Sequence, residues 1–125
     1  MASSTSFTDL AGADAERAFG LAGSLLAAGE AHRAKAQLEL AVALFDASGR
    51  AREGAKARRA LAHALRRLGD PSARAVLEDA GTMFEGLGDE DAVVAIDREL
   101  RELEAEVEES PRSFHARSSA PPPVR

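Results

Sequence analysis

The segments ALFDASGR (residues 43–50) and TMFEGLGD (residues 82–89) follow the same pattern. Each contains a phenylalanine that is followed four residues later by a glycine. The spacing from Phe45 to Phe84 is the same as the spacing from Gly49 to Gly88. Two equal separations raise the question of whether the chain is one structural unit written twice.

The match extends through both units. Four pairs share one spacing: Leu21 and Leu61, Ala22 and Ala62, Leu25 and Leu65, Gly29 and Gly69. Four later pairs share a spacing that is shorter by one: Ala34 and Ala73, Leu38 and Leu77, Ala41 and Ala80, Phe45 and Phe84. The change of spacing indicates that one residue is missing from the turn after Gly69. Because the pairs keep their order and their chemistry, the sequence predicts an internal repeat.

The sequence of each unit predicts two helices, because it contains two runs of apolar residues at helical spacing and each run is followed by a glycine. In the second unit, Asp70 as N-cap and Pro71 as first helical residue predict where the second helix begins. A fifth helix follows, with acidic residues in its first turn, where the helix dipole favours them. The predicted organisation is a helical domain over residues 9–109, with units 13–49 and 50–88 and a terminal helix 89–109, between disordered segments 1–8 and 110–125.

The composition favours an all-α fold. Much of the 45% hydrophobic content is alanine, and there is no tryptophan or tyrosine, whereas β-proteins favour β-branched and aromatic residues. The net charge of −5 provides no basic field for nucleic acid. There are no cysteines, so disulfides and thiolate metal sites are excluded. Without a signal-peptide pattern or a long apolar run, we expect a soluble, cytoplasmic protein that binds no membrane.

The repeat resembles the tetratricopeptide repeat family. The resemblance rests on small residues at Ala22, Ala34 and Ala41, large residues at Leu21, Leu25 and Leu38, and the glycine turn between the helices. Residues Ala15–Phe45 and Ala55–Glu85 match the pattern, the second segment with one deletion. The units are about 39–40 residues long, rather than the roughly 34 of the family, and they lack its closing proline. This long form resembles the helical repeat regions of large bacterial transcriptional regulators.

The resemblance implies a solenoid of helical hairpins: two helix pairs and a C-terminal capping helix, wound into a right-handed superhelix. It also implies that the first helix of each pair lines the concave side. The chain has no P-loop and no recognisable DNA-binding helix-turn-helix, so the regulators' own function does not carry over.

No motif predicts an enzyme, a cofactor or a metal site. The only histidines are His32, His63 and His115, and none has a second histidine or a glutamate in a metal-binding arrangement. The Gly49–Gly54 turn, GRAREG, lacks the ending of a phosphate-binding loop.

The predicted third helix carries a basic stripe. Its members are spaced to share one face of a helix: Lys56, Arg59, His63 and Arg66. One interpretation is a groove that binds an acidic peptide. The favoured interpretation is internal pairing with the acidic fifth helix, because residues 85–109 hold eleven acidic and two basic residues. Such exposed pairs contribute only about 0–1 kcal/mol each.

Two other features have two interpretations each. Glycines inside the first helix, Gly20 and Gly23, favour either close packing of small residues or a flat groove wall that a ligand backbone can approach. The apolar residues of the fifth helix indicate either a cap over the second helix pair or a short coiled-coil seam: Val93, Ile96, Leu100, Leu103 and Val107.

The first helix pair is expected to leave an apolar flank uncovered around Phe19 and Leu26, which would be an interface. We therefore predict a protein–protein interaction module, an adaptor or regulatory scaffold that binds a partner peptide or helix on its concave face. The partner would be another protein, acidic if the basic stripe binds it, or a second copy of the chain. The alternatives are a self-associating structural protein and a regulatory component of a transcription or signalling system without its own DNA-binding domain.

Overall fold

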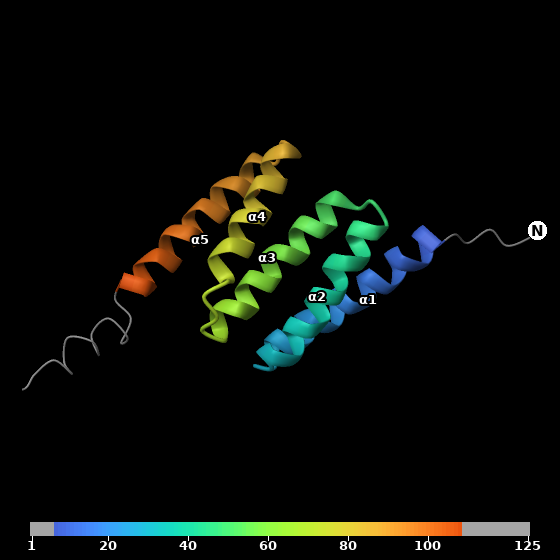
Figure 1. Cartoon of the computed structure of the whole chain (residues 1–125), viewed down its shortest axis with the longest axis horizontal. Coiled ribbons are helices and arrows are strands. Elements are labelled where there is room, and N and C mark those ends of the chain that lie inside the picture. The colour runs from blue at the N-terminus through green and yellow to red at the C-terminus, as the bar shows by residue number, and fades with distance from the viewer. Residues whose placement is uncertain (1–6, 109–125) are drawn as a thin grey trace, which may run out of the picture.

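The computed structural model describes residues 7–108. This part of the chain contains helices and turns but no strand, so the all-α prediction is confirmed. The helices are α1 (Phe7–Ala27), α2 (Ala31–Ala47), α3 (Ala51–Arg67), α4 (Ala73–Gly86) and α5 (Glu90–Glu108). Each helix packs against the next one along the chain. In Figure 1, α1 and α2 lie at one end of the molecule, α3 lies in the middle, and α4 and α5 lie at the other end.

The first four helices end in the same way. The glycine after each helix has a positive φ, between 71° and 80°, at Gly29, Gly49, Gly69 and Gly88. The residue after each glycine donates its backbone N–H to the carbonyl five positions earlier: Glu30 to Leu25, Arg50 to Phe45, Asp70 to Leu65 and Asp89 to Phe84. This bond belongs to the Schellman cap, which needs a left-handed residue that glycine adopts without strain. One helix with its turn is therefore a unit of about 20 residues, and two such units form the repeat in the sequence.

Small residues let the helices of each pair approach closely. The alanines at equivalent positions of the two units are all buried: Ala34, Ala41, Ala73 and Ala80. The larger side chains between them fill the core, with Phe45 and Phe84 at the C-terminal ends of α2 and α4. The alanine pairs that the repeat aligns are therefore buried in both units.

Helix α5 covers the second helix pair. Ile96 is only 1% exposed and shares a core cluster with Leu77, Ala80 and Phe84 of α4. Val93 and Leu100 pack against the same cluster. The apolar stripe of α5 is thus used within the molecule and does not supply a coiled-coil seam; the side chain of Val107 lies outside the described residues.

Three details differ from the sequence prediction. Helix α1 begins at Phe7 rather than after a disordered segment 1–8. Helix α4 begins at Ala73, two residues later than predicted. The carboxylate of Asp70 instead accepts hydrogen bonds from the backbone N–H and the hydroxyl of Ser72, at 2.9 and 2.7 Å. These bonds close a turn over Pro71 and Ser72 before the helix starts, and they lower the pKa of Asp70.

The side chain of Leu21 is also not where the repeat predicts it. Leu21 is 49% exposed, whereas its repeat equivalent Leu61 is 9% exposed. Leu61 shares a core cluster with Leu25 and Leu38 of the preceding helix pair. No described helix precedes α1, so the same side of α1 is left uncovered.

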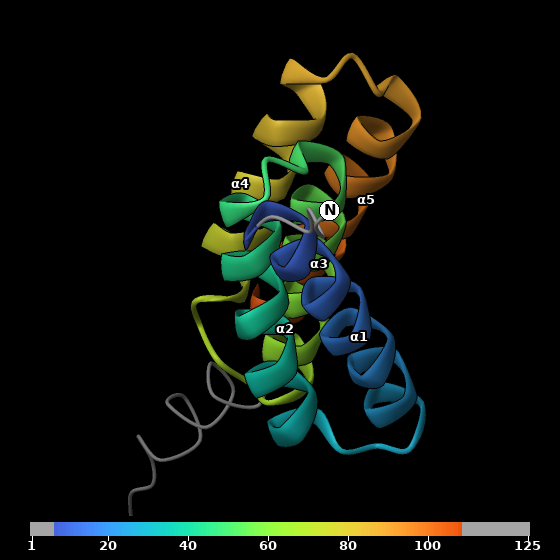
Figure 2. The same cartoon turned by 90° about the vertical axis from the view of Figure 1, so that its right-hand side faces the viewer.

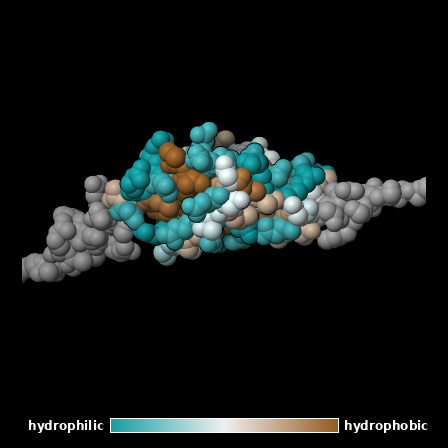
Figure 3. All heavy atoms as spheres, turned by 90° about the horizontal axis from the view of Figure 1, so that it is seen from above, coloured by the Kyte–Doolittle hydropathy of each residue, from teal (hydrophilic) through white to brown (hydrophobic). Residues whose placement is uncertain are grey.

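The exposed large apolar residues are spread over three helices: Leu10 and Leu21 on α1, Leu40 on α2 and Val94 on α5. Seen from above, one apolar patch lies in the left half of the molecule, toward α4 and α5, among polar residues (Figure 3). No described helix is long and apolar enough to cross a lipid bilayer.

Candidate functional site

A groove of about 520 Å³ lies between α1, α3 and α5, which we call the α1–α3–α5 groove. Helix α3 provides four of its lining residues, α5 with the turn before it provides another four, and α1 and α4 provide one phenylalanine each. The lining residues are Phe19 of α1; Lys56, Arg59, Ala60 and His63 of α3; Phe84 of α4; and Asp89, Asp91, Ala92 and Ala95 of the last turn and helix.

Three of the four residues of the basic stripe line this groove, namely Lys56, Arg59 and His63. Arg66, one turn further along α3, does not. The spacing predicted from the sequence therefore brings the stripe to one side of α3, but the groove ends before its last member.

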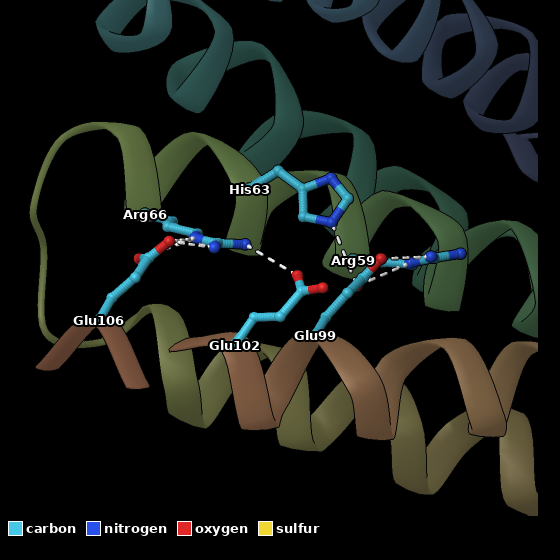
Figure 4. Close-up of polar contacts among 6 residues, drawn as sticks. All are labelled: Arg59, His63, Arg66, Glu99, Glu102 and Glu106. Carbon is cyan, nitrogen blue, oxygen red and sulfur yellow. Dashed lines mark hydrogen bonds and ion pairs between the residues drawn. The ribbon is translucent and has the colours of Figure 1, made fainter. Parts of the chain in front are cut away.

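Glu99 of α5 binds two members of the stripe (Figure 4). Arg59 donates to both carboxylate oxygens, and its Nε lies 3.1 Å from Oε1. His63 Nε2 lies 3.2 Å from the same Oε1. The carboxylate thus joins α3 to α5 across 36 to 40 residues of sequence.

Arg66 forms a second connection between the same two helices. Its Nε lies 3.0 Å from each carboxylate oxygen of Glu106, and Nη1 lies 4.0 Å from Glu102. Arg59, His63 and Arg66 all point toward α5 in Figure 4. The structure therefore contains the internal charge pairing that the sequence analysis favoured.

The pKa values of the two main carboxylates reflect these bonds. Partial burial of Glu99 acts to raise its pKa, but hydrogen bonds from Arg59 and His63 and their positive charges outweigh it. The pKa of Glu99 therefore lies below its ordinary value. A hydrogen bond from Arg66 lowers the pKa of Glu106 in the same direction.

Lys56 differs from the rest of the stripe. Its side chain is exposed and forms no ion pair with any described residue. On the α5 side of the groove, Asp91 is likewise exposed and unpaired among the described residues, whereas Asp89 binds Arg52 at 2.7 Å. The groove thus offers one charge of each sign that its own walls do not neutralise.

The sequence analysis expected Phe19 and Leu26 to lie on an uncovered flank of the first helix pair. In the structure both residues contact other helices instead. The ring of Phe19 contacts Phe45 edge-on, with centroids 6.2 Å apart, and also lines the groove. Leu26 packs against the core formed with α2 and α3, and its carbonyl accepts a bond from Arg67 Nη1 at 2.6 Å. These residues face α3; the uncovered side of α1 is the one that carries Leu10 and Leu21.

The sequence analysis did not assign the far side of the groove, made by Phe84, Asp89, Asp91, Ala92 and Ala95. A signal for part of it was available. If α5 is aligned as a third first-type helix, Ala95 falls at the position equivalent to Lys56. Phe84 carried no such signal, because the sequence analysis used it only to define the repeat.

Two of the three glycines in α1, Gly20 and Gly23, have no close neighbour among the described residues. A Cβ built on Gly20 or Gly23 would meet no atom within 4 Å outside its own helix and chain neighbours. Close packing inside the protomer therefore does not account for either residue.

Among residues 7–108, no group of three or more histidine, cysteine or acidic side chains is placed to hold a metal ion. Comparison of the chain with protein-family models, curated proteins and solved structures gives no match.

Proposed function

We propose that this chain is a protein–protein interaction module, an adaptor or regulatory scaffold that binds a partner peptide or helix in the α1–α3–α5 groove. The observation that carries the proposal is an open groove with charges on opposite sides that pair with no described residue, Lys56 on α3 and Asp91 on α5. In a tetratricopeptide-like solenoid, which the repeat resembles, this groove is the concave face.

The groove combines apolar and charged surface in the way that interfaces do. The ring of Phe19 and the methyl groups of Ala60, Ala92 and Ala95 supply apolar contacts along its length. A partner side chain placed among them would lose its contact with water, which is the main source of affinity for an apolar group.

The charges define the partner more narrowly than the basic stripe alone. Arg59 and His63 already bind Glu99, so a partner carboxylate would have to displace Glu99 to reach them. Lys56 is free of such competition. We therefore propose a partner with an apolar residue, an acidic residue directed at Lys56 and a basic residue directed at Asp91, rather than a uniformly acidic one.

Site-specific photo-crosslinking tests this proposal. A benzoyl-phenylalanine replaces Ala95 in the groove in one variant, and the exposed Ala75 of α4 in the matched control. A partner that binds in the groove crosslinks at position 95 and not at position 75, and it is then identified by mass spectrometry. Equal crosslinking at both positions, or crosslinking at position 75 alone, contradicts the proposal.

A further inference from the structure

One side of α1 carries four residues at spacings of four, three and four, which we call the α1 seam: Leu10, Asp14, Arg17 and Leu21. These spacings keep the four residues on one face of a helix. All four are exposed, Leu10 to 55% and Leu21 to 49%. Figure 2 shows the end of the molecule where α1 and α2 form the front layer.

The same side of α3 is an internal contact surface. The repeat equivalents of Asp14, Arg17 and Leu21 in the second unit are Gly54, Ala57 and Leu61, and all three are buried. Ala57 shares a core cluster with Ala15 and Phe45, from the preceding helix pair. The α1 seam therefore lies where a helix pair packs against its predecessor, with charges in place of small residues.

The seam has the same chemistry when it is followed in either direction. Leu10 precedes Asp14 by four residues, and Leu21 follows Arg17 by four residues. The two charged residues have opposite signs. Its centre lies between Ala15 and Glu16. A second copy of α1 can pack antiparallel to the first about a two-fold axis through that centre. Leu10 of each copy would then lie opposite Leu21 of the other copy, and Asp14 of each copy opposite Arg17 of the other.

We propose that the α1 seam is the interface of an antiparallel homodimer. A two-fold interface must be self-complementary, because the same patch serves both copies. Spacings of four and three are those of a and d positions in a coiled coil, where a polar layer between apolar layers fixes the register. Here Asp14 and Arg17 form an ion pair within one helix; in the dimer each carboxylate also faces the arginine of the other copy.

Small residues beside the seam support a close approach of two helices. Ala13, Gly20 and Ala27 recur at every seventh position on the exposed side of the seam. A glycine inside a helix costs about 1 kcal/mol relative to alanine, and no contact inside the protomer explains Gly20. Two antiparallel helices that meet along small residues can bring their backbones close together, which gives Gly20 a role.

The occupant is a second copy rather than an unrelated protein because the seam supplies both members of its own charge pair. It offers only two leucines per copy, so we expect dissociation in the micromolar range. Phe19, which lines the groove, is two positions from Leu21 in the chain and therefore lies on nearly the opposite side of the helix. The dimer thus leaves both grooves open and does not depend on the proposed function.

Charge exchange tests the pairing by sedimentation equilibrium over a wide concentration range. The wild type should dimerise. Asp14→Arg alone should set two arginines against each other, and Arg17→Asp alone should set two aspartates against each other. Each should raise the dimer Kd by about tenfold or more, since opposed like charges are strongly unfavourable.

An equimolar mixture of Asp14→Arg and Arg17→Asp should recover the dimer, because each introduced charge then faces an opposite charge on the other chain. Arg98→Asp, an exposed charge change on α5, is the control and should leave the Kd unchanged. A monomeric wild type, single variants that dimerise as the wild type does, or a mixture that stays monomeric would each overturn the proposal. Helical circular dichroism of every sample shows that the variants are folded.

Discussion

Glu99 on α5 accepts hydrogen bonds from Arg59 on α3, 40 residues earlier in the chain, and the same carboxylate contacts His63. These bonds lie beside the α1–α3–α5 groove, and they connect α5, which forms one side of the groove, to α3. The basic stripe of α3 thus divides into three residues that bind acids of α5, Arg59, His63 and Arg66, and one, Lys56, that forms no ion pair with any described residue.

Glu99→Gln should lower the free energy of unfolding by about 1 kcal/mol at neutral pH, the upper range for a partly exposed ion pair. The loss should shrink on acidification. The pKa of Glu99 is lowered by folding, so its contribution is complete above the ordinary glutamate pKa of about 4.3 and disappears as the pH falls through the folded value. Urea unfolding of wild type and variant at pH 7 and pH 3 measures both values, and a difference that stays constant with pH would contradict the assignment.

Ala41→Leu should destabilise the fold by ~1–3 kcal/mol, because Ala41 is fully buried and the enlarged side chain overpacks the contact between helices. Ala36→Leu on the same helix is the control, since Ala36 is exposed. Thermal unfolding followed by circular dichroism compares the two. Equal midpoints for both variants and the wild type would show that Ala41 is not at a tightly packed position.

Gly49→Ala should also destabilise, by about 1–2 kcal/mol, because φ is +72° at this position and a Cβ is strained there. Gly23→Ala should have the opposite sign. Gly23 lies inside α1 with open space around its Cα, so alanine should stabilise by about 0.5–1 kcal/mol. Urea midpoints that move in the same direction for both variants would be inconsistent with this account of the helix ends.

The repeat in the sequence predicted the helices, and the alanines that it aligns are buried in both units, because both features depend on local spacing that each unit carries within itself. Burial of Leu21 could not be predicted in the same way. Leu21 and Leu61 occupy equivalent positions, and among the described residues a helix pair precedes Leu61 but not Leu21. Burial of such a leucine depends on whether another helix pair packs against that side of its helix, and the local sequence pattern does not contain this information.

The candidate site was predictable in part for a similar reason. The spacing of Lys56, Arg59 and His63 is enough to place them on one face of α3. The acid that each residue meets depends on the position of α5 along α3, which is set by packing of Ile96 into the core. That Lys56 forms no ion pair with any described residue had no signal in the sequence.

Arg59→Glu and Lys56→Glu should separate the two roles of the basic stripe. Reversal of Arg59 places a like charge against Glu99 and should lower the thermal midpoint, whereas reversal of the exposed Lys56 should change it little. Differential scanning calorimetry of both variants measures this. Equal losses would mean that Lys56 also holds the helices together.

The affinity of the crosslinked partner for three chains tests the central claim most directly: wild type, Lys56→Glu and the control Arg98→Glu on the outer side of α5. Isothermal titration should give about a tenfold or larger rise in Kd for Lys56→Glu, with no change for Arg98→Glu, because only Lys56 lies in the groove. The thermal midpoints of the free proteins should be equal. A partner that binds Lys56→Glu as tightly as wild type would contradict binding in the α1–α3–α5 groove.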